Sequence, residues 1–169
     1  MEIPTFPVMQ YIIGGLKGDK DQMDRAVALA KGRHGAEHWV AHAEALAQAR
    51  SGRLQDARRL SSRAVDLALQ EGNYEAVASY RAARAFWLAA CGNAAEGKRN
   101  AMGALELSKG RDVQYAAGLG LALSGDSARS QLLADDLERR LNLAASGRRA
   151  PEQWRSRKGK PTDERSSLG

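Results

Sequence analysis

The chain has 169 residues, which suits one domain with a hydrophobic core and is short for two. It contains 31 alanines but only 11 valines, isoleucines and threonines together, and its four prolines lie near the ends, which excludes a sheet protein and predicts an all-α fold. The net charge of +6 falls mostly on residues 142–169, which carry +4 and leave +2 for residues 1–141, so the body lacks the basic excess of a nucleic-acid-binding domain.

Residues 1–141 are predicted to form one helical domain. In chain order, helices are expected at residues 7–17, 20–31, 36–50, 54–71, 74–90, 94–108, 112–124 and 127–141. Asp19, Asn73 and Asp112 stand at the start of three of these segments, where a side-chain oxygen is expected to cap the helix N-terminus. Residues 142–169 are rich in Arg, Ser, Gly and Lys, which predicts a basic, disordered tail.

A glycine followed by a short polar stretch recurs at Gly18, Gly52, Gly92 and Gly125. The separations of 34, 40 and 33 residues lie in the range of helical repeat proteins. Glycine adopts a positive φ between two helices without steric cost, and closely packing residues follow five and twelve positions later on one helical face. The pattern predicts four antiparallel helix pairs stacked as an α-solenoid with a concave side.

The segment GRLQDARRLSSRAVDLA (residues 52–68) has two interpretations. Arg58 and Arg59 ahead of Ser61 resemble the target of a kinase that prefers arginines before its serine. Helical periodicity instead places Ser61 among the alanines of a packed stripe, with the arginines on the solvated side. A kinase needs an extended and accessible serine, so we favour the packing interpretation.

The second helix of each pair resembles that of tetratricopeptide repeats, with residues 52–68 the closest match. This resemblance covers roughly residues 8–141. The segments GDKDQMDRAVALAKGRHGAEHWV (residues 18–40) and ALELSKGRDV (residues 104–113) also resemble the C-terminal repeat region of large bacterial serine/threonine protein kinases. The resemblance implies a non-catalytic protein–protein interaction module that is the sensor or regulatory region of such a kinase, or a fragment derived from one.

In repeats of this kind the first helix of each pair lines the concave groove, so the resemblance implies a protein or peptide partner there. The candidate groove residues are Trp39, His42, Tyr80, Arg84 and Trp87. Aromatic and arginine side chains are typical anchors of binding surfaces. The alternative for the aromatic residues is packing in the core, which we favour for Tyr80 and Trp87.

The chain lacks the catalytic motifs of a kinase, and GLGLAL (residues 118–123) is interpreted as small residues for close helix packing. His38 and His42 have two alternatives, as metal ligands on one helical face or as partly exposed histidines near the groove. The order HExxH is absent, so we favour the second. Cys91 is interpreted as a small packing residue at a helix end. We therefore predict no enzymatic activity, cofactor or metal.

The tail segment RRAPEQWRSRKGK (residues 148–160) surrounds one tryptophan with basic residues, a weak pattern for nucleic acid. The alternative function is thus a small nucleic-acid-associated protein that acts through this tail, although a solvated extension is favoured. The resemblance implies a further repeat after Leu141. We therefore expect that the array is truncated or has left its reading frame there, so that the last helix lacks a neighbour.

No apolar run approaches the roughly 20 residues that a membrane-spanning helix needs. The start MEIPTFPVMQ lacks the basic segment of a secretory signal, and Cys91 is the only cysteine, so no internal disulfide can form. We expect a cytoplasmic protein without a membrane partner.

Overall fold

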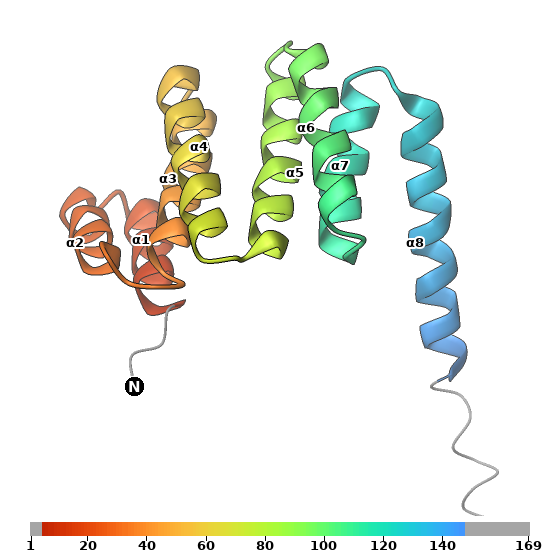
Figure 1. Cartoon of the computed structure of the whole chain (residues 1–169). Helices are drawn as coiled ribbons and strands as arrows, with labels where there is room; N and C mark the ends of the chain where they lie inside the picture. The colour runs from red at the N-terminus through yellow and green to blue at the C-terminus, as the bar shows by residue number, and fades with distance from the viewer. Residues whose placement is uncertain (1–4, 148–169) are drawn as a thin grey trace, which may run out of the picture.

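The computed structural model describes residues 5–147, and within this range the chain forms eight α-helices and no strand (Figure 1). The helices are α1 (Thr5–Lys17), α2 (Lys20–Ala30), α3 (Glu37–Arg50), α4 (Leu54–Gln70), α5 (Tyr74–Ala90), α6 (Ala94–Leu107), α7 (Arg111–Leu123) and α8 (Ser127–Gly147). The all-α prediction is confirmed. Helix α8 continues six residues past the predicted domain boundary at Leu141, and the rest of the predicted tail lies outside the described residues.

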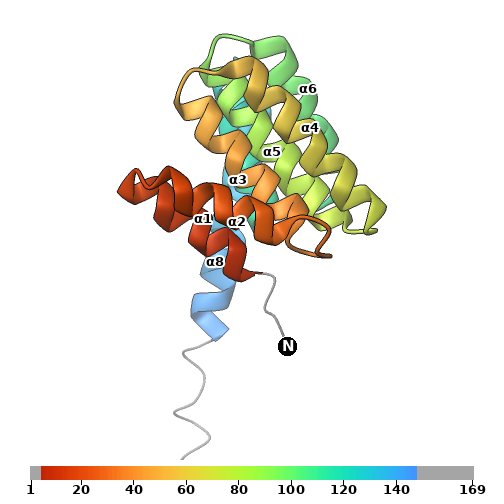
Figure 2. The ribbon, with the colours of Figure 1, turned by 90° about the vertical axis from the view of Figure 1, so that its left-hand side faces the viewer.

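The helices form four consecutive pairs, α1–α2, α3–α4, α5–α6 and α7–α8, and each pair packs against the next (Figure 1). Helix α5 contacts both its partner α6 and the following odd-numbered helix α7. Figure 2 shows that α1 and α2 run at an angle to α3 and α4. This side-by-side stacking is the predicted arrangement of helix pairs. It places the odd-numbered helices along one face of the stack and the even-numbered helices along the other.

The turn glycines predicted from the repeat have the expected backbone. Gly18, Gly52, Gly92 and Gly125 have φ values of 71°, 74°, 84° and 81°, respectively. At each of these turns a glycine in the left-handed region closes the preceding helix at low steric cost. Gly72 adopts the same conformation with φ of 69° at the turn from α4 to α5, although it was not among the predicted turn glycines.

A stripe of alanine side chains packs α4 against its neighbours. Ala57, Ala64 and Ala68 are completely buried, and Ser61 lies on the same stripe with its side chain buried. Arg59 lies on the exposed side of the helix. The packing interpretation of Ser61 is therefore confirmed, because this serine is buried within a helix and is inaccessible to a kinase. The prediction that the arginines lie on the solvated side holds for Arg59 but not for Arg58, which is half-buried and pairs with Glu96.

Glycines allow α5 to approach both of its neighbours closely. A Cβ atom on Gly120 of α7 would lie 2.9 Å from the Cβ of Ala85. A Cβ atom on Gly97 of α6 would lie 3.0 Å from the carbonyl oxygen of the same alanine. Residues 118–123 therefore act as predicted, as a segment that permits close helix packing.

Two of the three predicted N-caps are present. The side chain of Asp19 accepts a hydrogen bond from the backbone N–H of Gln22, and Asn73 caps α5 in the same way. The prediction for Asp112 is wrong, because α7 begins one residue earlier and Gly110 occupies the cap position. The backbone N–H of Gly110 donates instead to Oγ of Ser108, which holds this turn.

Candidate functional site

An apolar groove runs across helices α3, α5 and α7. It has a volume of about 490 Å³ and is almost entirely apolar. Its lining residues are Leu46, Ala49 and Arg50 of α3, Ala83, Phe86, Trp87, Ala90 and Cys91 at α5, and Tyr115, Ala116 and Leu119 of α7. Three consecutive odd-numbered helices thus contribute to one surface.

A second apolar groove lies between α1 and α3 and joins the first. It is lined by Tyr11, Ile12, Gly15 and Leu16 of α1, Met23 of α2, and Ala43, Leu46, Ala47 and Arg50 of α3. Because Leu46 and Arg50 line both, the two grooves meet on α3. We call the combined surface, from α1 to α7, the odd-helix groove.

Large apolar side chains along the odd-helix groove are exposed to solvent. Tyr115 is 63% exposed and Leu16 is 82% exposed, and Phe86 and Leu119 are also exposed. On α5 and α7, one stripe of small residues is already buried against neighbouring helices, which leaves these larger side chains on a second face. Contiguous exposed apolar surface of this kind marks interaction sites more often than isolated exposed residues do.

The structure separates the five predicted groove residues. Trp87 lines the odd-helix groove, but only 7% of its surface is exposed, so it forms the base of the groove and part of the core. Trp39 is exposed on α3 and lies outside the lining of the groove. Buried Tyr80 packs against half-buried His42, and Arg84 belongs to a polar network that also includes α4 and α6.

Tyr80 and His42 belong to a largely buried polar cluster that joins α3 to α5. The imidazole of His42 stacks on the Tyr80 ring with centroids 4.2 Å apart. Nδ1 of His38 lies 2.6 Å from the Tyr80 hydroxyl, and its Nε2 lies 3.2 Å from the carboxylate of Glu71. That carboxylate also accepts hydrogen bonds from the backbone N–H of Gly35. The cluster therefore links the second helix pair to the third.

Burial decides how this cluster titrates. Desolvation lowers the pKa of His42 to about 4 and lowers the pKa of His38, although Glu71 opposes the second shift. Burial, and then the charge of Glu71, raises the pKa of Tyr80 above its ordinary range. With hydrogen on Nε2, neutral His38 directs an N–H toward Glu71 and accepts the Tyr80 hydroxyl at Nδ1.

The metal-ligand alternative for His38 and His42 receives no support from this geometry. Both ring nitrogens of His38 face protein partners, and the described residues hold no group of three or more His, Cys, Asp or Glu side chains suited to a metal ion. These histidines are thus best explained as packed residues at a junction between helix pairs, on the buried side of α3.

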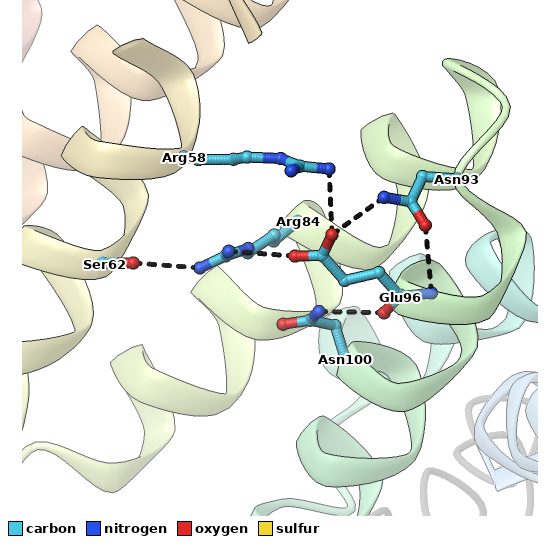
Figure 3. Close-up of polar contacts among 6 residues, drawn as sticks. All are labelled: Arg58, Ser62, Arg84, Asn93, Glu96 and Asn100. Atoms are coloured by element: carbon cyan, nitrogen blue, oxygen red, sulfur yellow. Dashed lines mark hydrogen bonds and ion pairs between the residues drawn. The ribbon is translucent and has the colours of Figure 1, made fainter. Parts of the chain in front are cut away.

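A second polar network centres on Glu96 and connects α4, α5 and α6 (Figure 3). The Glu96 carboxylate lies 2.9 Å from a guanidinium nitrogen of Arg58 and 3.1 Å from one of Arg84. Asn93 donates a hydrogen bond to the same carboxylate and accepts one from the Glu96 backbone N–H, which caps α6. The other terminal nitrogen of Arg84 donates to Oγ of Ser62. These contacts hold Arg84 between three helices.

Several residues of the odd-helix groove were not among the predicted site residues. Phe86, Tyr115 and Leu119 are large, exposed apolar residues of this groove. Their signal in the sequence is weak, because each helix is rich in apolar residues and periodicity alone does not tell which apolar stripe is left uncovered. Cys91 ends α5 as predicted, but it is exposed and lines the groove, so its interpretation as a packing residue is wrong.

No helix within residues 5–147 is both long enough and apolar enough to span a membrane. In comparisons with known proteins, no family model, no curated protein and no solved structure matched this chain.

Proposed function

We propose that this protein is a non-catalytic interaction module that binds an apolar segment of a partner protein in the odd-helix groove. The observation that carries the proposal is the continuous apolar groove across α1, α3, α5 and α7, with large side chains exposed along it. The proposal agrees with the resemblance of the sequence to tetratricopeptide repeats, in which the first helix of each pair faces the partner.

An amphipathic helix is the form of ligand that best suits this surface. A helix binds a groove through apolar residues spaced three, four and seven positions apart. Phe86, Trp87 and Tyr115 provide aromatic contacts at one end of the groove. Aromatic side chains of this kind carry a large share of the binding free energy in protein interfaces.

Arg50 provides an orientation for the ligand. Its side chain lines both halves of the odd-helix groove, and no carboxylate of the described residues lies within ion-pair distance of it. An acidic residue in the middle of an apolar ligand segment would therefore find a cationic partner there. The expected ligand is an amphipathic helix with apolar residues on one face and a central acidic residue.

The resemblance to bacterial serine/threonine kinases extends the proposal to a biological setting. We propose on that basis that the module is, or derives from, the regulatory repeat region of such a kinase. The alternative of a nucleic-acid-associated tail rests on residues outside the described range, and no contact within residues 5–147 favours it.

A peptide-display selection on the full chain tests the proposal. We expect selected peptides to have helical apolar spacing and to lose binding to the Leu119→Glu variant. Leu107→Glu is the matched control, because Leu107 and Leu119 are both 39% exposed and Leu107 lies outside the groove. A selection that yields no specific peptide, or peptides that bind both variants equally, would overturn the proposal.

A further inference from the structure

We propose that a second site, a polar cleft between α4, α5 and α6, binds the phosphate or carboxylate group of an acidic peptide. The cleft has a volume of about 310 Å³. Its polar lining comes from Ser62 and Asp66 of α4, Arg81 and Arg84 of α5, and Arg99 and Asn100 of α6. No lining residue is shared with the odd-helix groove, so this inference goes beyond the proposed function.

The cleft has more positive than negative charge. Three guanidinium groups line it, against the single carboxylate of Asp66. Arg84 is engaged by Glu96, but no hydrogen bond or ion pair to a described residue is formed by Arg81 or Arg99. An anionic group in the cleft would therefore meet two guanidinium groups whose hydrogen-bonding capacity is unused, and Arg–phosphate and Arg–carboxylate pairs are among the strongest polar contacts in proteins.

One of the three arginines of the cleft, Arg84, is held in place before a ligand arrives. Arg84 is fixed at both terminal nitrogens, by Ser62 and by Glu96 (Figure 3). Arg81 lies over the backbone of α6 at Gly103, where an added Cβ atom would approach its Nη1 to 3.4 Å. Positioning side chains in advance reduces the entropy lost when a ligand binds. This saving applies to Arg84, whereas Arg81 and the exposed Arg99 are ordered when the anionic group binds.

The cleft faces away from the odd-helix groove. Arg81 and Phe86 are five residues apart on α5, which places them about 140° apart around the helix axis. Phe86 lines the odd-helix groove, whereas Arg81 lines the cleft. The two surfaces can therefore be occupied and tested separately.

A peptide fits the cleft better than a nucleic acid does. No aromatic side chain lines it, so it offers no surface on which bases could stack. Asp66 interrupts the basic surface, which disfavours a long polyanion with closely spaced phosphates. A single anionic group on a flexible segment avoids Asp66 while it reaches Arg81 and Arg99.

The test is an NMR titration of the ¹⁵N-labelled full chain with inorganic phosphate, a phosphoserine peptide, a glutamate peptide and a single-stranded oligonucleotide. We expect saturable shifts of the Asn100 and Gly103 amide signals with phosphate and with at least one of the peptides. The comparison of the phosphoserine and glutamate peptides identifies which anionic group the cleft prefers.

Variants show whether the arginines of the cleft are responsible. We expect Arg81→Gln and Arg99→Gln each to weaken peptide binding about tenfold. Arg99 is exposed, so its substitution leaves the fold intact. Arg59→Gln is the control, because Arg59 is an exposed arginine of α4 whose one ion pair among the described residues is with Asp56. Unsaturable shifts, equal binding to all three variants, or tighter binding of the oligonucleotide at this cleft would overturn the proposal.

Discussion

Nδ1 of His38 and the hydroxyl oxygen of Tyr80 lie 2.6 Å apart across the junction between α3 and α5. Both side chains are buried, and Tyr80 is only 5% exposed. Their contact joins the second helix pair to the third, together with the stacking of His42 on the tyrosine ring. The polar atoms of this cluster thus specify how two neighbouring pairs are arranged, which sets the relative positions of the helices that line the odd-helix groove.

Removal of the Tyr80 hydroxyl should destabilise the protein. In Tyr80→Phe the buried Nδ1 of His38 loses its hydrogen-bond partner, and we expect the free energy of unfolding to fall by about 1–3 kcal/mol. Urea denaturation followed by circular dichroism measures this change. Tyr74→Phe is the matched control: Tyr74 is exposed, so the loss of its hydroxyl should leave the stability unchanged. Equal stabilities of the two variants would show that the hydrogen bond contributes nothing.

The protein should lose stability as the pH falls from about 6.5 to about 4. The folded-state pKa of His42 is about 4, below its ordinary value of 6.5, so the unfolded chain binds more protons in this window and acid favours unfolding. The contribution of His42 is on the order of 3 kcal/mol, and the lowered pKa of His38 acts in the same direction.

The variant His42→Phe keeps an aromatic ring against Tyr80 but cannot titrate. We expect urea denaturation at a series of pH values to give a flatter stability profile for this variant than for the parent chain. His34→Gln serves as the comparison, since the side chain of His34 is 82% exposed and acts on the cluster only through its charge near His38, so its loss should change the slope less than His42→Phe does. If the free energy of unfolding of His42→Phe depends on pH as steeply as that of the parent chain, the acid sensitivity comes from other groups.

Loss of the Glu96 charge should loosen the contact between α4 and α6. In Glu96→Gln, Arg58 and Arg84 both lose their carboxylate partner, and we expect a loss of about 1–3 kcal/mol in the free energy of unfolding. Hydrogen exchange should show faster opening near Ser62. Glu106→Gln changes an exposed glutamate of the same helix and should have no effect. An unaltered rate of hydrogen exchange in Glu96→Gln would mean that the network does not stabilise the packing of α4 against α6.

A methyl group added at Gly120 should separate α7 from α5. The new Cβ would lie 2.9 Å from the Cβ of Ala85 and 3.1 Å from its backbone, so one helix has to move, at a cost of about 1–3 kcal/mol. Gly15→Ala should instead be neutral or stabilising, because its Cβ would meet only the Met23 side chain at 3.9 Å and alanine favours the helix. Thermal unfolding measures both effects: we expect a lower Tm for Gly120→Ala and an equal or higher Tm for Gly15→Ala.

The features that could be predicted from the sequence are local. The helix ranges follow from apolar periodicity, and the positive φ angles of Gly52 and Gly92 follow from their places between two periodic segments. The burial of Ser61 follows from its place on the alanine stripe of α4. Each of these predictions depends on residues within one or two helical turns of the position concerned.

The features that could not be predicted depend on how one helix pair is rotated against the next. His38 and Tyr80 are 42 positions apart, and nothing in either helix indicates that their polar atoms meet. The same holds for Phe86 and Tyr115, whose exposure depends on which apolar stripe of α5 and α7 remains uncovered. Of the predicted groove residues, only Trp87 lines the odd-helix groove, and Trp39 is exposed elsewhere on α3.

The most direct test of the odd-helix groove as the partner-binding site is the rate at which iodoacetamide alkylates Cys91, with and without a cysteine-free peptide selected on the full chain. Cys91 is the only cysteine, is exposed, and lines the odd-helix groove. If the peptide binds there, alkylation slows several-fold and saturates with peptide concentration, in the parent chain and in Leu107→Glu but not in Leu119→Glu. An alkylation rate that stays constant at saturating peptide would contradict the assignment of this groove as the partner-binding site.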